Sequence, residues 1–381
     1  MNEEWSEALD RTIVSVVPKF DEILKEYPYI KDYADKLTQI KLGVLDHLDE
    51  YVKMTVESVE KSGGVPHLVK DKNESQKVVR DICGKEGMVL FAKSNVALEL
   101  EIRESLARDG HEVWETDLGE FLVQLAHEHP SHIVVPAIHM TKERIGKLLH
   151  DGLDARVSSD STYEELVASV RKFLFQKYIN AKVGITGANA VAAATGSVVL
   201  VENEGNIRMD TVIPSTHIAI TGVDKIVPTL EDAFLEAQVQ SAYAGLYPPT
   251  YINVTSGPSS TADIESKHVT PATGPKEFHL VLVDNGRRKA VGDPDLRNAL
   301  LCIKCGRCYF ACPVYGTLGY DWMQPPYGGP TGAMWSAIID DDTRPANLCT
   351  HSGGCKVVCP VQIDIPKVLE HIKWLDSQKN R

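Results

Sequence analysis

The sequence predicts an α/β domain with a mostly parallel sheet flanked by helices, followed by a small, mainly helical domain rich in cysteine. Two observations favour this fold class. Between residues 65 and 283, short apolar runs alternate with amphipathic stretches, which is typical of strand–helix units in a parallel sheet. Seven of the eight cysteines then lie between Cys302 and Cys359. With 381 residues, the chain is long enough for two or three domains.

Charge and composition exclude several classes of partner. The formal net charge is −13, and an acidic surface repels phosphate groups, so we expect neither nucleic acid nor anionic membrane as a partner. No run of 18 apolar residues is present, so no transmembrane helix is expected. The first residues are acidic and lack the basic start and apolar core of a secretion signal. The expected compartment is therefore the cytoplasm.

Three segments are predicted along the chain. They are an N-terminal helical segment (1–62), an α/β domain (63–294) and a cysteine-rich domain (295–381). Apolar residues recur at three- and four-residue spacing in the first segment, which predicts two or three helices. These stretches are 7–17, 31–42 and 45–59. Pro18 and Pro28 are expected to break the first stretches. The helices are expected to cover a sheet or to mediate assembly.

The α/β domain is predicted from apolar runs that alternate with helical periodicity. Strands are expected over 66–69, 87–93, 112–115, 131–138, 182–186, 197–201, 217–222, 251–255 and 278–283. Helices are expected over 74–84, 95–109, 118–128, 141–149, 161–178 and 229–237. Three cations, Arg287 to Lys289, follow the last strand. We expect them in a solvated turn, with contact to an acidic ligand or to the cysteine-rich domain as the alternatives.

One loop in this domain is a candidate anion site. A strand ends at Thr186–Gly187, a helix of small residues is expected next, and Thr195–Gly196 opens another strand. The start of such a helix offers free N–H groups to an anion. Tight packing of the helix on the sheet is the alternative reason for these small residues. The candidate binding residues are Thr186, Gly187, Asn189, Thr195, Gly196 and Asn203.

Two carboxylates follow the second of these strands. Glu202 and Glu204 are two positions apart, so their side chains are expected to face the same way. Like charges held close together raise one pKa, which suits an acid or base catalyst. Glu202 and Glu204 are therefore the candidate catalytic residues, and two solvated loop carboxylates are the alternative.

The first cysteine run is the most specific motif. Its spacing, Cys302-x2-Cys305-x2-Cys308-x3-Cys312-Pro, is typical of bacterial ferredoxins, in which three thiolates hold one cubane cluster and the fourth reaches a second cluster. Two-residue gaps let successive sulfurs converge, whereas the three-residue gap points the fourth sulfur elsewhere. A zinc site and a disulfide framework are the alternatives. Four cysteines in this pattern disfavour zinc, and a long chain expected in the cytoplasm keeps its thiols reduced.

The second run lacks one cysteine. It reads Cys349-x2-Ser352-x2-Cys355-x3-Cys359-Pro, with serine at the position of the second cysteine. Proteins with two such runs exchange the last cysteine between clusters. The predicted ligands of cluster one, a [4Fe–4S] cluster, are Cys302, Cys305, Cys308 and Cys359. The predicted ligands of cluster two are Cys312, Cys349 and Cys355, with Ser352 at the fourth corner.

Ser352 decides the expected type of the second cluster. A hydroxyl group is a harder ligand than a thiol and has a higher pKa, so it holds iron weakly. We predict a [3Fe–4S] cluster, or a [4Fe–4S] cluster with one labile iron. Ligation of the fourth iron by Ser352 or His351 is the alternative. The spacing C-x5-C-x3-C-P is similar to the three-iron site of succinate dehydrogenase iron–sulfur subunits. With one thiolate fewer, cluster two is expected to have the higher reduction potential.

Between the runs, Trp322, Tyr327 and Trp335 stand in a segment rich in proline and glycine. A small two-cluster domain has little core of its own, so these aromatic side chains are expected to pack around the clusters and exclude water. After the second run, KVLEHIKWLDSQK shows apolar residues at helical spacing and predicts a terminal helix.

Longer stretches resemble the lactate utilization (LUD-domain) proteins, and among them the lactate utilization protein B family. The resemblance covers roughly residues 60–365. It rests on Glu115–Glu120 (ETDLGE), Ser131–His139 (SHIVVPAIH), Gly184–Gly196, Val201–Gly205 (VENEG), Thr221–Asp232 (TGVDKIVPTLED) and Ala299–Pro313. The family usually has two full four-cysteine runs, and Ser352 departs from that pattern. Fuller members also continue further beyond the second run.

The resemblance implies a NagB/CoA-transferase-like sheet with an anion or nucleotide crevice, and a role as the iron–sulfur subunit of the bacterial L-lactate oxidation system. The leading hypothesis is an electron-transfer subunit whose two clusters carry electrons from lactate, or another 2-hydroxy acid, to an acceptor. Other subunits of that complex are the implied partners. The alternative is an enzyme whose own crevice transforms a small carboxylate or CoA-like ligand with Glu202 or Glu204. A non-catalytic assembly or sensor protein is a third hypothesis. No flavin or nicotinamide fingerprint is present.

Overall fold

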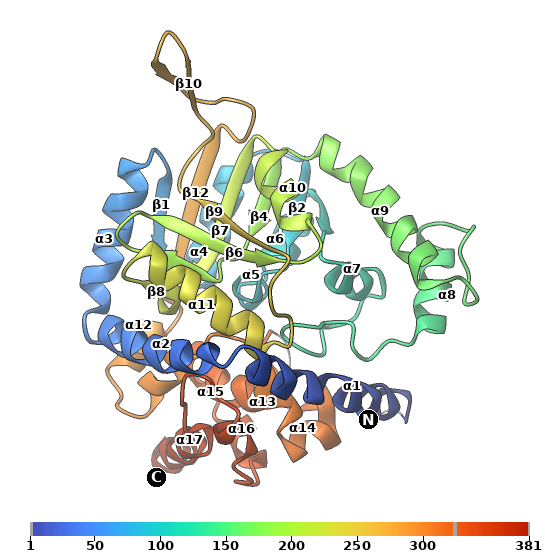
Figure 1. Cartoon of the computed structure of the whole chain (residues 1–381), viewed down its shortest axis with the longest axis vertical. Helices are drawn as coiled ribbons and strands as arrows, with labels where there is room; N and C mark the ends of the chain where they lie inside the picture. The colour runs from blue at the N-terminus through green and yellow to red at the C-terminus, as the bar shows by residue number, and fades with distance from the viewer. Residues whose placement is uncertain (1–2, 323–325, 380–381) are drawn as a thin grey trace.

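Two β-sheets with helices on their faces lie above a helical, cysteine-rich region in Figure 1. The computed structural model describes residues 3–322 and 326–379. Residues 1–2, 323–325 and 380–381, which the predicted terminal segments include, lie outside the described residues. The first and last helices, α1 and α17, both lie in the lower part of the view, at opposite sides of the cysteine-rich region.

The larger sheet has six parallel strands in the order β1-β12-β7-β4-β2-β3. They are β1 (Val65–Val69), β2 (Met88–Ala92), β3 (Glu112–Glu115), β4 (Val183–Thr186), β7 (Thr216–Gly222) and β12 (Glu277–Val283). Phe91, Ile185 and Ile218 are buried in this sheet. Near-continuous apolar strands of this kind form sheets that are covered on both faces. The predicted α/β fold with a mostly parallel sheet is confirmed.

A smaller sheet packs beside it in the order β8-β5-β6-β9. Its strands are β5 (Ala190–Ala192), β6 (Ser197–Glu202), β8 (Ile226–Val227) and β9 (Tyr251–Thr255). The expected helix of small residues is wrong, because β5 pairs with β6 in an antiparallel hairpin. Burial of this hairpin overrides the helical preference of alanine. A further hairpin, β10 (Thr261–Ile264) and β11 (Lys267–Val269), projects at the top of Figure 1.

Helices cover both sheets. They are α4 (Lys72–Cys83), α5 (Asn95–Glu99), α6 (Ile102–Arg108), α7 (Leu118–Leu125), α8 (Lys142–Gly152), α9 (Tyr163–Asn180), α10 (Asn206–Val212), α11 (Leu230–Tyr243) and α12 (Arg287–Val291). The helix predicted over 95–109 is split at Glu101, which has a left-handed backbone. The strand predicted over 131–138 is wrong. There the His132 ring accepts hydrogen bonds from the N–H groups of Val134 and Val135, which turns the chain into a loop.

Three N-terminal helices span the two halves of the molecule. They are α1 (Glu3–Glu26), α2 (Tyr29–Asp46) and α3 (Leu48–Lys61). Leu9, Ile30 and Leu37 belong to the same buried core as the side chains of the cysteine-rich region. Pro28 separates α1 from α2 as predicted, but Pro18 lies inside α1. Leu9 before Pro18 and Phe20 after it are buried, so packing of the helix compensates for the backbone hydrogen bond that a proline removes.

The cysteine-rich region is mainly helical, as predicted. Its helices are α13 (Arg307–Phe310), α14 (Pro313–Leu318), α15 (Gly329–Ile339), α16 (Gly354–Val357) and α17 (Ile365–Lys379). Trp322, Tyr327 and Trp335 are almost completely buried among the cysteines and aliphatic residues, so the predicted aromatic packing is confirmed. In the described part of the chain, no helix has the length and apolar character needed to cross a membrane.

Candidate iron–sulfur centre and adjoining cavity

The two cysteine runs fold as a repeated loop. In the first, Lys304 and Gly306 have left-handed backbones with φ of +62° and +77°, and α13 follows. In the second, His351 and Gly353 have φ of +56° and +80°, and α16 follows. Every equivalent pair is 47 positions apart in the sequence. Ser352 therefore has the loop position that Cys305 has in the first run.

The thiols of the two runs gather in two groups. In the first thiol group, burial and, to a smaller extent, the nearby thiols of Cys359 and Cys302 raise the pKa of Cys305 to about 12. The pKa of Cys308 is raised well above its usual value by burial and by the same neighbours. The first thiol group is Cys302, Cys305, Cys308 and Cys359.

The second thiol group is Cys312, Cys349 and Cys355. Burial raises the pKa of Cys355 to about 12, and the neighbouring thiols of Cys312 and Cys349 add to that shift. Burial also raises the pKa of Cys312, with Cys349 as its neighbouring thiol. Each group contains three cysteines of one run and the last cysteine of the other, except that Ser352 replaces one cysteine in the second group. This is the exchange of the last cysteine expected for proteins with two such runs. Their role as cluster ligands stays a prediction.

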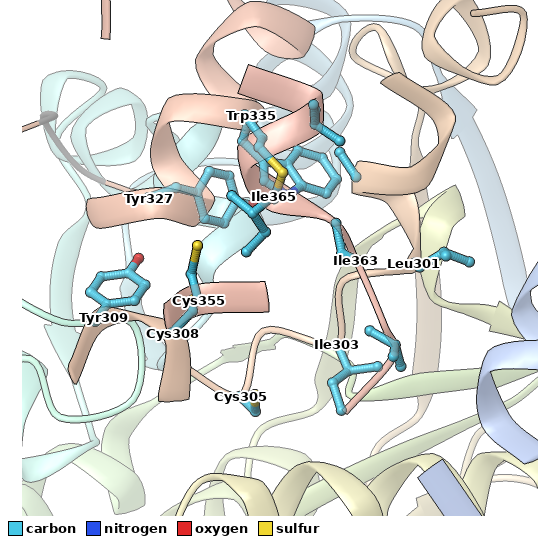
Figure 2. Close-up of a cluster of buried hydrophobic side chains, with 14 of the residues drawn as sticks. Leu301, Ile303, Cys305, Cys308, Tyr309, Tyr327, Trp335, Cys355, Ile363 and Ile365 are labelled. Atoms are coloured by element: carbon cyan, nitrogen blue, oxygen red, sulfur yellow. The ribbon is translucent and has the colours of Figure 1, made fainter. Parts of the chain in front are cut away.

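The chemistry of these residues fits iron–sulfur clusters. All eight cysteines are free thiols, and Figure 2 shows Cys305, Cys308 and Cys355 among buried apolar side chains. A buried thiol with a raised pKa stays neutral unless a cation replaces its proton, and iron supplies that charge. The backbone N–H of Ile363 donates to Cys359 Sγ at 3.4 Å, as the N–H of His351 does to Cys349 Sγ. Within residues 3–322 and 326–379, no group of three or more His, Cys, Asp or Glu side chains has the spacing of a single-ion site.

The α/β domain holds the first loop in place. Gln240 Nε2 donates to the Ile303 carbonyl at 2.6 Å. The His132 Nδ1 atom accepts two backbone hydrogen bonds, so Nε2 carries the proton and donates to the Gly306 carbonyl at 3.2 Å. Burial lowers the pKa of His132 to about 3, which keeps the ring neutral. A Cβ atom at Gly306 would lie 2.6 Å from the His132 ring, so only glycine fits there.

The second loop faces solvent. His351 and Ser352 are exposed, whereas Cys305 is buried. Lys373 Nζ lies 3.2 Å from His351 Nε2 and donates weakly to the Cys349 carbonyl. Three large apolar side chains nearby in the chain are also exposed. They are Leu348, Val357 and Trp374, with exposed fractions of 48%, 85% and 55%.

A buried ionic network joins the two halves. Arg287 donates to Glu99 at 2.8 Å and to Asp224 at 2.5 Å, and all three side chains are buried. From the cysteine-rich region, Tyr327 donates to Glu99 at 2.8 Å, and the Trp335 ring lies 4.8 Å from the guanidinium carbon of Arg287. The expected solvated turn at Arg287 is therefore wrong, and the alternative contact with the cysteine-rich domain is correct.

A cavity of about 400 Å³ lies between the carboxyl ends of the parallel strands and the first cysteine loop. Asn203 and Glu204, at its mouth, are exposed. Lys225, Lys304 and Tyr327, at its floor, are buried. A cavity of about 460 Å³ beneath α1 is lined by none of the cysteines or predicted site residues. The first cavity is therefore the candidate ligand site.

The structure separates the predicted anion-site residues into two sets. Gly187, Asn189 and Asn203 line the cavity. Thr186 is buried and bonds to the His217 ring at 2.9 Å. Thr195 and Gly196 lie in the turn at the opposite end of the β5–β6 hairpin from Asn189. A Cβ atom at Gly196 would approach the backbone nitrogen of Val59 to 2.6 Å, so this glycine serves close packing of α3.

Glu202 and Glu204 both line the cavity but differ in environment. Glu202 is bound by Arg208 Nε at 2.9 Å and by Asn253 Nδ2 at 2.7 Å. Glu204 lies at the mouth, where its Oε2 atom accepts a hydrogen bond from the Leu118 N–H at 3.0 Å. Burial of this carboxyl group, aided by Asp117, raises its pKa to about 7. Glu204 is therefore the better placed acid or base. The catalytic role of both residues stays a prediction.

Sequence reasoning missed several residues of the cavity. They are Lys93, Asp117, Asp224, Lys225, Lys304 and Tyr327. They come from separate loops, so no single spacing connects them. Asp117 and Lys225 lie within stretches that carry the family resemblance, and Lys304 stands between two predicted cluster ligands. These places in the sequence are the only signal that could have pointed to the cavity residues.

Comparisons with known proteins agree with this geometry. The LUD domain family matches residues 52–283, and the 4Fe-4S dicluster domain matches residues 298–363. Lactate utilization protein B of Bacillus pumilus is 39% identical over 306 residues, which cover 79% of this chain and 62% of that protein. The uncharacterized electron transport protein YkgF of Escherichia coli is 36% identical over 321 residues, covering 83% of this chain and 65% of that protein.

The chain thus spans a little under two-thirds of the length of these curated relatives. Among solved structures, a DUF162 family protein from Deinococcus radiodurans aligns with a TM-score of 0.34 and 12% identity, over 62% of this chain and 98% of that chain. The dicluster match supports an iron–sulfur electron-transfer role. Because the LUD match covers more than half of the chain, this protein belongs to the LUD domain family and carries a C-terminal ferredoxin-type 4Fe-4S dicluster domain.

Proposed function

We propose that the chain is the iron–sulfur electron-transfer subunit of a complex that oxidises lactate or another 2-hydroxy acid. The observation that carries this proposal is the pair of thiol groups on a repeated loop, one against the cavity and the other near the surface. The substrate class is supported by relatives named lactate utilization protein B. The acceptor is a separate protein or carrier.

The proposed ligands follow the two thiol groups. Cluster one, a [4Fe–4S] cluster, is assigned to Cys302, Cys305, Cys308 and Cys359. Cluster two is assigned to Cys312, Cys349 and Cys355, with Ser352 at an open corner. Exposure of Ser352 supports a [3Fe–4S] cluster or a [4Fe–4S] cluster with a labile iron, because solvent reaches the position of the missing thiolate.

When bound, the clusters would accept and release single electrons. The chain supplies the order of transfer. Tyr309, Tyr327 and Trp335 exclude water from the first thiol group, which lies beside the cavity. The loop of the second thiol group faces solvent at His351 and Ser352, and the smaller thiolate charge of this group favours the higher potential. Electrons are therefore proposed to pass from the cavity side through cluster one to cluster two.

The three predicted segments have separate proposed roles. Residues 63–294 form the LUD unit and hold the ligand cavity, and residues 295–381 hold the clusters. Residues 1–62 contact both units, because Lys41 donates to the Asp224 carbonyl of the LUD unit and Asp21 pairs with Arg307 of the cluster unit. Other subunits of the oxidation complex are the proposed partners, and the cytoplasm is the proposed compartment.

A reduction assay tests the relay. The reconstituted protein is mixed with a chemical one-electron donor under anaerobic conditions, and reduction of each cluster is followed by EPR and visible absorbance. We expect both clusters to become reduced and to pass electrons to an added acceptor. Substitution Glu204→Gln is expected to leave this transfer unchanged. Failure of reconstituted clusters to transfer electrons would contradict the relay.

A second function is favoured by Glu204 alone. A carboxyl group with its pKa near 7 suits general acid–base work at neutral pH. In that case the cavity itself transforms a small carboxylate or CoA-like ligand. Glu204→Gln would then abolish turnover while both clusters persist. Glu202→Gln is the matched comparison, because Glu202 lines the same cavity but its carboxylate is paired with Arg208.

A further inference from the structure

The floor of the cavity contains a buried lysine, Lys304, whose amino group has no hydrogen-bond partner among the described residues. The Lys304 side chain lines the cavity, and the residue is only 6% exposed. Among the described residues, its Nζ atom has no hydrogen-bond acceptor. Its close neighbours are two aromatic rings, with ring centroids 3.1 Å away for Trp335 and 4.5 Å away for Tyr327. An ammonium group in such a place needs an anion to offset the cost of its burial.

The neighbouring buried charges already have partners. Lys225 donates to Glu236 at 3.1 Å, and Lys41 donates to the Asp224 carbonyl at 2.8 Å while also facing Glu236. The Asp224 carboxylate pairs with Arg287, which also pairs with Glu99. No carboxylate of this network forms an ion pair with Lys304 in the described part of the chain. The counter-charge for Lys304 therefore comes from a ligand or from cluster one.

The volume of the cavity exceeds that of a three-carbon acid. Such an acid has six non-hydrogen atoms, and even at about 30 Å³ for each, it fills roughly 180 Å³. The cavity holds about 400 Å³. Its walls include the apolar side chains of Ile133, Leu200 and Ile207. These features favour a ligand with an apolar body and a polar head.

The charges of the lining favour a single negative charge on that head. Three lysines line the cavity, and four carboxylates oppose them. They are Lys93, Lys225, Lys304, Asp117, Glu202, Glu204 and Asp224. Glu202 pairs with Arg208, Asp224 with Arg287 and Lys225 with Glu236, and Lys93 donates to the Val134 carbonyl. Among the described residues, this leaves Lys304 as the lining lysine without a partner, which one carboxylate would match. The second carboxylate of a dianion would instead meet Asp117 or Glu204.

We propose that this cavity binds an organic monocarboxylate with an apolar body longer than three carbons, its carboxylate placed against Lys304. Because Lys304 stands between Cys302 and Cys305, the bound head group lies against the loop of the first thiol group. The binding site stands apart from the proposed electron relay, and only its spectroscopic readout rests on that relay. The competing account is that Lys304 serves only as counter-charge to cluster one.

The repeated loop gives an internal comparison. The equivalent of Lys304 in the second loop is His351, which faces solvent and has Lys373 as a neighbour. That loop adjoins none of the cavity residues. Lys373 is therefore a matched control: it is a lysine beside the second thiol group, outside the cavity.

Calorimetry with simple probes tests the ligand class on the reconstituted full chain. We expect hexanoate to bind about fifteenfold more tightly than butanoate, at about fourfold for each buried methylene group. Adipate, the dianion of the same length, and 1-hexanol, which has no charge, are expected to bind at least tenfold more weakly than hexanoate. Equal binding of hexanoate and adipate, or of hexanoate and 1-hexanol, would overturn the proposed head group.

Variants then separate the two accounts of Lys304. Lys304→Met is expected to lose at least tenfold in hexanoate affinity, whereas Lys373→Met keeps the wild-type affinity. Hexanoate is also expected to change the EPR spectrum of reduced cluster one in the wild type only. If Lys304→Met binds hexanoate normally while its ligand-free cluster spectrum changes, Lys304 serves the cluster alone and the proposal is wrong.

A substitution at the mouth guards against a folding defect at the cysteine loop. Leu246 lines the cavity and is 47% exposed, so Leu246→Trp narrows the entrance without touching that loop. We expect this variant to keep its iron and to lose hexanoate binding. Normal binding by Leu246→Trp would contradict the site. If the protein takes up no iron on reconstitution but still binds hexanoate, the relay is contradicted and the cavity proposal is supported.

Discussion

The two cysteine loops share a backbone but not an environment. Lys304 and Gly306 repeat the left-handed geometry of His351 and Gly353. The first loop is covered by the LUD domain, through Gln240 and His132, whereas the second is open to water. Local sequence therefore determines the shape of each loop, and tertiary packing determines what each loop contacts. We infer an inner cluster that meets the ligand cavity and an outer cluster that meets a partner.

The largest effect is expected from Cys305→Ser, which gives the first loop the serine of the second. At the second loop, water can complete the coordination of iron, but the first loop is buried and offers no such replacement. We expect loss of the whole first cluster, so that iron falls from about seven to about three atoms per chain. Iron and sulfide analysis measures this. Retention of about six irons, as in two three-iron clusters, would show that burial of the first loop does not affect how its cluster tolerates serine.

The reverse substitution, Ser352→Cys, restores the missing thiol. A fourth thiolate holds the labile corner, so iron is expected to rise from about seven to about eight atoms per chain. The EPR signal of an oxidised three-iron cluster should disappear. An unchanged signal would mean that Ser352 does not lie at the open corner.

Two ion pairs sharpen the comparison of buried and exposed regions. Arg287 and Glu99 are completely buried, so Arg287→Met leaves uncompensated charge and should lower the free energy of unfolding by about 3–5 kcal/mol. Arg344 is exposed and pairs with Asp342 near the second loop, so Arg344→Met should leave the free energy of unfolding almost unchanged. Anaerobic denaturant titration compares them. Equal costs would remove the distinction between the two regions.

The pH dependence of the free energy of unfolding tests the buried carboxyl group of Glu120 in the LUD domain. Burial raises the pKa of Glu120 to about 7. The folded state therefore keeps this proton where the unfolded chain has lost it, and stability falls as pH rises from about 4.5 through 7. The loss attributable to Glu120 is about 3 kcal/mol. Glu120→Gln should reduce the slope of the unfolding free energy between pH 5 and pH 7, while the part due to Glu204, whose pKa is also raised to about 7, remains. If the free energy of unfolding of Glu120→Gln falls with pH as steeply as in the wild type, the pH dependence comes from other groups.

The smallest effect is expected from His351→Ala. His351 is exposed and lies beside Lys373, so it has a partner other than iron. Iron content and the EPR spectrum should stay at wild-type values. A loss of one iron would identify His351 as the fourth ligand of the second cluster.

Sequence patterns predicted the parallel sheet, the aromatic packing and the two-run cysteine motif. They succeeded where the signal is local, as in the spacing of Cys302 to Cys312. They failed at Ala190–Ala192, because strand pairing with a distant segment overrides the preference of alanine for helix. They also favoured a solvated turn for Arg287 and missed Lys304, because the roles of both residues depend on burial between separate elements. The cavity joins loops far apart in the chain, so no single motif predicted it.

Iron and sulfide analysis, combined with EPR on anaerobically purified protein before and after dithionite, tests the central claim most directly. We predict about seven irons per chain, an oxidised three-iron signal before reduction and a reduced four-iron signal afterwards. About eight irons without the first signal would assign a fourth ligand to the outer cluster and leave the relay intact. Little iron together with bound zinc would contradict the account.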